Sequence, residues 1–360
     1  RLPHRLLADL EVFIDVVKSP LAIRSSSLLE DSHYQPFAGI YSTYMIPYDE
    51  DKYCRLEMLA NAIKGVYASV YFRGSKDYMT ATSNVIDQEK MAVILQEVVG
   101  QQYGTRFYPN VSGVARSVNY YPIGDEKAEE GTVSLAMGLG KYIVDGGTSL
   151  RVCPYHPTQV LQMSEMDIAL RDTQTSFYAL ETSIPKDKYG YRIKTVFQVD
   201  DGFNLVKIPV REAEQDGSLQ WICSTFDPVD QCIYDGFYEG RNRKLISFAG
   251  VPQNGVWPMP ELLRLVLKLG QEEMKRPVEI EFACNINKDK TGDFYLLQIR
   301  PMVDNRMQLD EDLSAIPDEQ CLLRSHNAIG HGNITDITDI VYIKTGEKSK
   351  YTPGKNPQIA

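Results

Sequence analysis

Two stretches near the end of the chain decide the fold: Pro277-Val-Glu-Ile-Glu-Phe-Ala-Cys-Asn285 and Asp293-Phe-Tyr-Leu-Leu-Gln-Ile-Arg-Pro301. In each stretch, large apolar side chains recur at every second position. Such alternation is typical of a strand with one buried face and one polar face. The run Asn287-Lys-Asp-Lys-Thr-Gly292 between them has the composition of a turn. The sequence therefore predicts two half-buried strands paired as a hairpin.

The position of the turn determines which residues of the two strands face each other. A turn centred on Asp289-Lys290 places Glu281 opposite Gln298, and Glu279 opposite Arg300. Directly opposed side chains have Cβ atoms roughly 4.5–5.5 Å apart. One face of the hairpin is therefore expected to carry carboxylate, amide and guanidinium groups side by side.

These groups are the parts of a magnesium-phosphate site. Magnesium takes oxygen ligands from one or two protein groups and leaves its other positions to water and phosphate, and a guanidinium grips phosphate oxygens as a fork. A second interpretation stays open at this point. Cross-strand pairs such as Glu279 with Arg300 are also common as purely structural contacts.

Composition points to an ordinary globular protein. The chain has 360 residues, of which 43% are hydrophobic and 24% are charged, and this length suggests two domains or one large two-lobed domain. A net charge of −10 without a long basic cluster argues against nucleic acid or an anionic membrane as a partner. The six cysteines lack CxxC spacing and no apolar run reaches membrane length, so we expect a cytoplasmic location.

Apolar periodicity outlines the first third of the chain. Spacing near 3.6 residues predicts helices over 5–18 and from about 55 to 72. A short strand is predicted at Leu21–Arg24. The nearly continuous apolar run from Met91 to Val99 predicts a strand buried on both faces. Its polar end, at Gln96 and Glu97, could offer backbone groups to an adenine ring.

The serine-rich segment Arg24-Ser-Ser-Ser-Leu-Leu-Glu-Asp-Ser32 has two interpretations. Ser27 and Glu30 match a helix capping box, although no amphipathic run follows them. Alternatively, three successive hydroxyls behind Arg24 could form a loop that holds phosphate through backbone N–H groups.

The remaining pattern is mostly short strands. They are predicted at Gly113–Tyr121, Thr132–Met137, near Ile143, on both sides of a hairpin turn at Asp200-Asp-Gly202, at Leu219–Ser224 and at Lys244–Phe248. Pro258 and Pro260 introduce a helix that leads into the hairpin. The glycines at 138–147 do not form a Walker loop, and the five histidines show no metal spacing.

Six motifs in order identify a family. The chain resembles the ATP-binding domain of the phosphoenolpyruvate synthase and pyruvate phosphate dikinase family. The motifs are Arg24-Ser-Ser-Ser-Leu-Leu-Glu-Asp-Ser32, Gln35-Pro-Phe-Ala-Gly-Ile-Tyr-Ser-Thr-Tyr44, Lys90-Met-Ala-Val-Ile-Leu-Gln96, Ser112-Gly-Val-Ala115, Gly138-Leu-Gly140 and Glu279-Ile-Glu-Phe282 with Leu297-Gln-Ile-Arg-Pro301.

The resemblance implies an α+β fold of the ATP-grasp type, in which two lobes with mixed or antiparallel sheets clamp Mg-ATP. By this resemblance the first lobe covers residues 1–88, the second covers 89–304 with extra strands at about 160–250, and 305–360 is a linker. The linker would lead to a phosphohistidine domain and a pyruvate-binding domain. The implied partners are thus a nucleotide and those two domains, and phosphoryl groups would pass through the histidine to pyruvate.

The resemblance also implies a role for individual residues. Arg24 would contact the terminal phosphate and Arg300 would bind phosphate, and these two would be the catalytic residues. Magnesium would be held by Glu281 and Gln298. The nucleotide would be bound by Arg24, Gly39, Thr43, Gln96, Glu97, Val98, Val99, Glu281, Gln298 and Arg300, with 96–99 as the adenine hinge.

Several positions depart from the family pattern. Arg116 and Ser117 follow Gly-Val-Ala where Phe-Thr is usual, and Lys141 follows Gly-Leu-Gly where Glu is usual. The family's glycine-rich segment with its phosphate-binding lysine is expected upstream of this chain. The changes at Arg116 and Lys141 keep one alternative open, a nucleotide-sensing module without chemistry. A dikinase with an acceptor other than pyruvate stays open as well, because the acceptor domain would decide the substrate.

Overall fold

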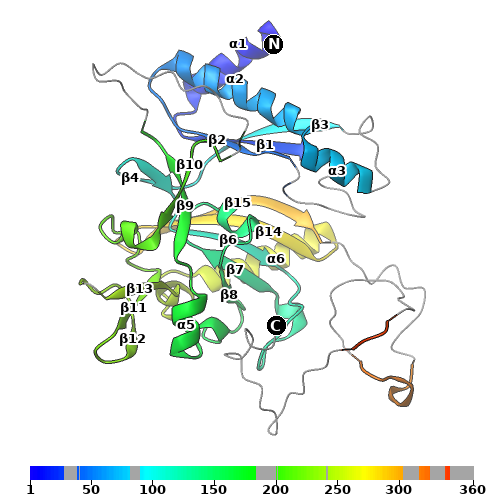
Figure 1. Cartoon of the computed structure of the whole chain (residues 1–360), viewed down its shortest axis with the longest axis vertical. Coiled ribbons are helices and arrows are strands. Elements are labelled where there is room, and N and C mark those ends of the chain that lie inside the picture. The colour runs from blue at the N-terminus through cyan, green and yellow to red at the C-terminus, as the bar shows by residue number, and fades with distance from the viewer. Residues whose placement is uncertain are drawn as a thin grey trace.

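The chain has the predicted α+β fold, with two lobes of the ATP-grasp-like type (Figure 1). Every strand pair among the described residues is antiparallel. This is a computed structural model, and it describes residues 1–27, 39, 41–81, 90–183, 200, 202–240, 242–302, 316–324 and 337–340.

Two helices cover a three-stranded sheet in the N-terminal part, at the top of Figure 1. Asp51 caps the second helix by accepting from the N–H groups of Tyr53 and Cys54, which explains where that helix begins. Both predicted helices and both predicted strands are confirmed. The elements here are α1 (His4–Val16), β1 (Leu21–Ser27), β2 (Tyr44–Ile46), α2 (Lys52–Ser69), α3 (Arg73–Ala81) and β3 (Met91–Glu97), with sheet order β2-β1-β3.

Two details of this sheet differ from the expectations. Strand β3 lies at an edge and is only partly buried, with Ile94 48% exposed, so the prediction of burial on both faces is wrong. The three serines at 25–27 continue β1 instead of opening a phosphate loop. The rest of the predicted loop, residues 28–32, lies outside the described residues.

A five-stranded sheet with order β15-β14-β6-β7-β8 forms the base of the second part. Its strands are β6 (Val111–Arg116), β7 (Thr132–Ala136), β8 (Leu150–Val152), β14 (Val278–Ile286) and β15 (Gly292–Pro301). Since β14 is central, it is buried on both faces, and the prediction that it is half-buried is wrong. The prediction holds for the edge strand β15.

Helix α6 (Met259–Met274) covers one face of this sheet. Gly270 allows the close approach, because a Cβ there would lie 2.7 Å from the Ile299 side chain and 3.2 Å from Val278. Successive side chains in a strand point to opposite faces. The apolar set of β14 therefore packs on α6, and Glu279 and Glu281 lie on the other face.

The predicted hairpin register is confirmed, although its predicted turn is not. Glu281 pairs with Gln298 and Glu279 with Arg300. Near the turn, however, Ile286 pairs with Gly292, which puts the turn centre at Asp289. A β-bulge between these two regions leaves one extra residue, Leu297, on β15 and corrects the offset.

Two smaller sheets complete the fold. They have orders β10-β9-β5-β4 and β12-β11-β13. The predicted strand at Lys244–Phe248 is confirmed for residues 244–246, whereas only the last two residues of the strand predicted at Leu219–Ser224 lie in a strand and residues 219–222 form turns. The predicted strand near Ile143 is wrong, because this residue lies in α4. Of the predicted hairpin at 200–202, only the second strand lies within the described residues. The bounds are β4 (Gln101–Tyr103), β5 (Arg106–Tyr108), α4 (Lys141–Val144), α5 (Met166–Asp172), β9 (Ser176–Glu181), β10 (Leu205–Pro209), β11 (Cys223–Asp227), β12 (Cys232–Asp235), β13 (Arg243–Ile246) and single turns at Ala128–Glu130, Leu161–Met163, Val210–Ala213, Ala249–Gln253 and Asp318–Gln320.

The apolar interior is divided into two main cores. The smaller core lies between α1, α2 and the first sheet, and its buried members fall within residues 10–66. The larger core lies around the five-stranded sheet and α6, with buried members within 108–286. A third cluster of four buried residues lies separately and draws on both parts of the chain: Ala22, Val98, Leu139 and Leu180. The division at residues 88 and 89 stays a prediction, since β3 begins just beyond it and pairs with β1.

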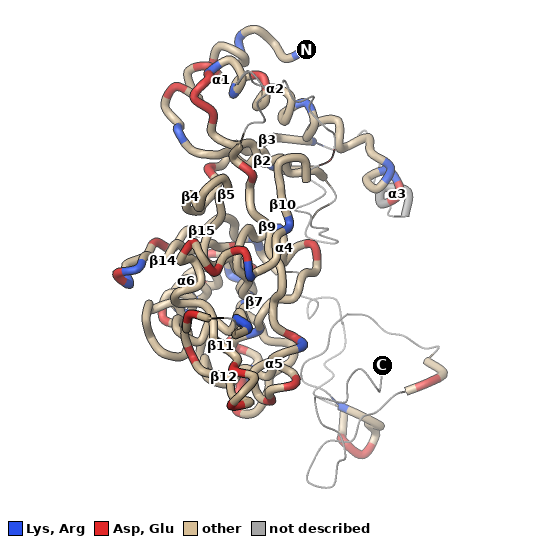
Figure 2. The backbone as a smooth tube through the Cα atoms, turned by 60° about the vertical axis from the view of Figure 1, so that its left-hand side comes forward, with Lys and Arg blue, Asp and Glu red and all other residues tan. Residues whose placement is uncertain are grey.

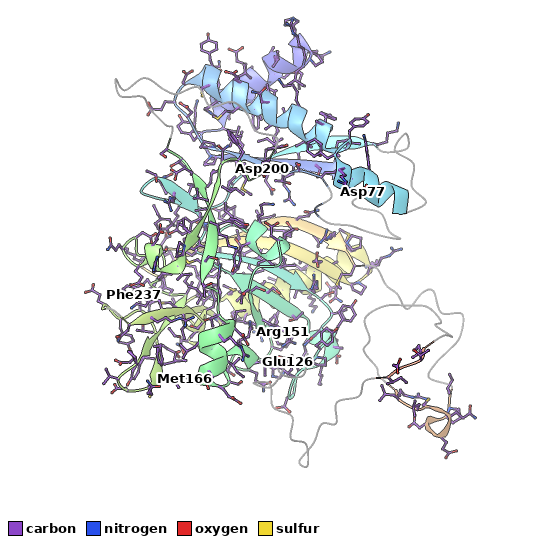
Figure 3. All side chains as sticks on the ribbon, viewed as in Figure 1. Asp77, Glu126, Arg151, Met166, Asp200 and Phe237 are labelled. Carbon is purple, nitrogen blue, oxygen red and sulfur yellow. The ribbon has the colours of Figure 1, made fainter. Side chains whose placement is uncertain are left out.

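Charged residues occur along the whole described part of the backbone, with basic and acidic positions interspersed (Figure 2). One ion pair with a buried carboxylate lies in the lower part of the molecule, where Glu126 and Arg151 are neighbours (Figure 3). Their side chains are 2.7 Å apart, and the same Glu126 oxygen accepts from Asn119 and from the N–H of Ile123. This pair braces the segment between β6 and β7, and neither residue lines the cavity described next.

Candidate nucleotide site

A cavity lies between the polar face of the five-stranded sheet and the face of the first sheet that carries Ala22, Arg24 and Gln96. Strands β1 and β3 contribute one wall, and β6, β14 and β15 contribute the other. All ten residues expected to bind nucleotide or metal line this one cavity: Arg24, Gly39, Thr43, Gln96, Glu97, Val98, Val99, Glu281, Gln298 and Arg300. The structure thus brings together residues that are up to 276 positions apart in the sequence.

Arg24 is the centre of the polar contacts across this cavity. Its Nη2 donates to Glu281 Oε2 at 3.2 Å and to Gln298 Oε1 at 2.6 Å, and its Nη1 donates to Gln96 Oε1 at 3.1 Å. The Gln96 amide in turn donates to the carbonyl of the bulged residue Leu297 at 3.1 Å. These contacts join β1 and β3 to the hairpin.

The same contacts test whether the hairpin fits a magnesium ion. Oxygens of Glu281 and Gln298 converge on a single nitrogen of Arg24, so the two groups already surround one positive charge. A carboxylate with an amide oxygen is a donor set that suits Mg²⁺ when water and phosphate fill its other positions. Across the described ranges no group of three His, Cys, Asp or Glu side chains is placed to hold a metal ion.

A second row of charges lies beside the first, at Arg116, Glu279 and Arg300. The Glu279 carboxylate is 8% exposed and accepts from Arg300 Nε at 2.8 Å on one oxygen and from Arg116 Nε at 2.6 Å on the other; Arg300 Nη2 also donates to it. Two guanidinium groups around one carboxylate leave a net positive charge next to the cavity. The sequence predicted that Glu279 pairs with Arg300 across the hairpin. It did not predict Glu279 as a site residue.

The pKa of Glu279 reflects both its burial and its partners. Burial alone would raise this pKa, but the charges of Arg300 and Arg116 and their hydrogen bonds hold it below its ordinary value. A carboxylate with a lowered folded-state pKa stabilises the fold above the unfolded-state pKa. That contribution is lost as the pH falls through the folded-state pKa.

We therefore expect a pH-dependent effect of Glu279→Gln. At pH 7 the variant should have a lower free energy of unfolding than the parent chain, because two arginines lose their shared charged partner. The difference should begin to shrink as the pH falls below about 4.5, the ordinary value for Glu, since the carboxyl of the unfolded parent chain then becomes protonated while the folded one stays charged. It should be lost as the pH falls through the lowered folded-state pKa. Urea unfolding at several pH values checks this, and a difference that stays constant down to pH 3 would contradict it.

Backbone groups at the end of β3 form another part of the wall. The N–H of Val98 donates to the carbonyl of Pro20 at 2.9 Å, which makes these two residues a hydrogen-bonded pair of the β1–β3 ladder. Pair types alternate along an antiparallel ladder, so the N–H and C=O of Glu97 point away from β1. The Glu97 carboxylate accepts from Ser19 at 2.5 Å.

Other wall residues were not expected as site residues. Tyr41 and Met45 come from the segment that contains Thr43, and Leu139 with Gly140 precedes α4. Lys141, one of the departures from the family pattern, lines the cavity and pairs with Asp145 at 3.2 Å. Tyr41 lies within the quoted Gln35–Tyr44 motif and Met45 directly follows it, so that motif was the signal that could have found them.

Comparison with known proteins agrees with this architecture. The family model described as the pyruvate phosphate dikinase AMP/ATP-binding domain matches residues 1–319. The chain belongs to this family. The matched residues include both walls of the cavity.

One curated relative is the phosphoenolpyruvate synthase of Aeropyrum pernix. It is 23% identical over 313 residues, which cover 87% of this chain and 32% of the relative. The chain thus spans about a third of the length of the curated relative it matches.

In the described ranges, no helix has the length and apolarity needed to cross a membrane.

Proposed function

We propose that this dikinase-family chain binds Mg-ATP in the cavity and donates a phosphoryl group to a histidine on a separate domain, from which it passes to pyruvate. One observation supports this most: Arg24, Glu281 and Gln298 come from opposite walls and meet at one point. That constellation combines cationic phosphate binding with an oxygen pair for a metal. The family match and the synthase relative are in agreement with it.

The chain's own residues would act by positioning and electrostatics. Phosphoryl transfer requires little covalent chemistry from the protein, and its rate depends on aligned groups and on stabilised charge. We propose that Arg24 and Arg300 grip the terminal phosphate, with Arg300 oriented by Glu279. Glu281 and Gln298 would hold Mg²⁺, which when bound neutralises negative charge on the phosphates.

Adenine recognition is proposed at the end of β3. The outward carbonyl of Glu97 can accept from the 6-amino group of adenine, and the N–H of Val99 can donate to the neighbouring ring nitrogen. Leu139 and Met45 supply apolar wall. Guanine carries a carbonyl where adenine carries the amino group, so it would place two acceptors against each other.

Calorimetric titration of the chain with a non-hydrolysable ATP analogue tests this proposal. With Mg²⁺ present we expect saturable binding, and about 100-fold weaker binding of the matching GTP analogue, since an unpaired buried polar group costs a few kcal/mol. Equal affinity for both nucleotides would contradict the adenine site. Absence of any nucleotide binding would overturn the proposed function.

The domain assignment and the acceptor belong to the same proposal. We retain 1–88 and 89–304 as the two ATP-grasp lobes, and residues from 305 as the connection to the acceptor domains. Pyruvate as final acceptor is tested with a protein that includes those domains. Steady AMP release that requires pyruvate would support a dikinase, and nucleotide binding without AMP would favour a sensing module.

A further inference from the structure

Arg24 occupies the point at which the two oxygens of the proposed metal pair converge. Its Nη2 lies 3.2 Å from Glu281 Oε2 and 2.6 Å from Gln298 Oε1. The side chains of Arg24 and Glu281 are mostly shielded from solvent, with exposed fractions of 23% and 22%. A cation and this guanidinium cannot use the same two oxygens in the same place. Each therefore competes with the other.

We propose that Arg24 is an internal substitute for the metal: it holds the Glu281–Gln298 pair in the nucleotide-free chain and moves to the terminal phosphate when nucleotide enters. Metal and nucleotide would then bind as a coupled pair, and metal alone would bind poorly. The second half of this inference rests on the proposed nucleotide function. The first half concerns only the chain and a divalent cation.

The resting position of Arg24 is held from a second side. Its Nη1 donates to Gln96, and Gln96 donates to the Leu297 carbonyl, both at 3.1 Å. Leu297 is the extra residue of the β-bulge. The guanidinium fork is therefore satisfied at both ends before any ligand arrives, and an entering cation must displace an already hydrogen-bonded group.

A terminal phosphate changes this balance. It offers a guanidinium several charged oxygens in a bidentate arrangement, whereas in the resting position two of the three partners of Arg24 are neutral amides and the Glu281 carboxylate is 3.2 Å away. The arriving metal would replace Arg24 as the positive partner of Glu281. Once Arg24 has moved, the two oxygens on the hairpin are open to the metal. Because coupling between two ligands is reciprocal, metal must strengthen nucleotide binding by the same factor.

The test uses Mn²⁺ as the metal probe and measures free Mn²⁺ by electron paramagnetic resonance. The 360-residue chain is compared with Arg24→Gln, with Arg24→Gln/Glu281→Gln, and with Arg106→Gln as a matched control. Arg106 also pairs with a carboxylate, Glu181 at 3.3 Å, and its side chain is 30% exposed, but it does not line the cavity. Circular dichroism verifies folding, and Arg24→Lys replaces Arg24→Gln, alone or combined with Glu281→Gln, if the Gln variant does not fold.

Without nucleotide, Arg24→Gln is expected to bind Mn²⁺ about tenfold or more tightly than the parent chain, equivalent to the loss of a competitor worth about 1.4 kcal/mol. The added Glu281→Gln should cancel this gain, and Arg106→Gln should not reproduce it. Arg24→Lys should show a smaller gain in the same direction. Unchanged Mn²⁺ affinity in the Arg24 variants, or a gain that survives Glu281→Gln, would overturn the inference.

A second titration separates this inference from the proposed function. A non-hydrolysable ATP analogue should strengthen Mn²⁺ binding by the parent chain much more than by Arg24→Gln. If the analogue strengthens Mn²⁺ binding equally in the parent chain and in Arg24→Gln, then Arg24 does not move to the phosphate, although the chain still binds nucleotide. If the analogue has no effect on the parent chain, the proposed function and the transfer both fail, and the nucleotide-free titration alone decides whether Arg24 occupies the metal position.

Discussion

Glu281→Ala is expected to weaken Mg²⁺-dependent binding of a non-hydrolysable ATP analogue by at least about 100-fold. Mutation of groups that only support a metal ligand already costs roughly 10–100-fold, and here a proposed ligand itself is lost. Gln298→Ala should act in the same direction with a smaller effect, because an amide oxygen carries no full charge. Calorimetric titration with and without Mg²⁺ measures both variants.

The control for this prediction is Glu272→Ala, which removes an exposed carboxylate on α6, at the opposite face of the sheet from the cavity. Its nucleotide affinity should match that of the parent chain. If Glu281→Ala weakens binding equally with and without Mg²⁺, then Glu281 is not a metal ligand. If it leaves binding unchanged, the hairpin is not the metal site.

Gly113→Ala is expected to be the most destabilising single-methyl addition near the site, at about 3 kcal/mol, the upper end of the usual range for overpacking. A Cβ on Gly113 would lie 2.2 Å from the ring of Phe282. That ring is 1% exposed and stacks on Phe294 at 5.1 Å, so it has no room to move. Urea unfolding gives the change in the free energy of unfolding.

A compensating substitution makes this prediction specific. Gly113→Ala combined with Phe282→Leu should be more stable than the sum of the two single changes, because the smaller side chain provides space for the added methyl group. Gly74→Ala is the control, since nothing lies within 4 Å of its added Cβ. Strict additivity of the two changes would show that the ring contact is not the cause.

The hairpin shows how far sequence reasoning can reach. Alternation of polar and apolar residues is a local property, so both strands and the Glu281–Gln298 pairing could be predicted. The turn centre was wrong by half a residue, and the bulge at Leu297 compensated for it. A bulge of this kind depends on contacts in the folded chain, including the hydrogen bond from Gln96 to the Leu297 carbonyl. The local sequence pattern does not predict it.

Burial of individual strands was less accessible to prediction. The apolar composition of β3 suggested a central strand, yet β3 is an edge strand, and β14 is central despite its two glutamates. Strand order is set by the topology of the whole sheet, which a single segment does not contain. The short apolar run at Ile143 became α4 for the same reason: four residues are too few to show a period.

The site residues could be named in advance only through the resemblance to the family. Composition and spacing alone left Arg24 in an ambiguous serine-rich segment. Its contact with Glu281 joins residues 257 positions apart, and its place between Glu281 and Gln298 depends on side-chain geometry. Such convergence is visible only in three dimensions.

The separation of the interior into two main cores has a practical consequence for unfolding experiments. Both tryptophans of the chain, Trp221 and Trp257, belong to the larger core, and the smaller core has none. Tryptophan fluorescence therefore reports the part that carries the hairpin, whereas far-ultraviolet circular dichroism also reports α1 and α2. Loosely joined cooperative units can open at different free energies. A difference between the two optical signals would then show directly which half of the molecule a substitution has weakened.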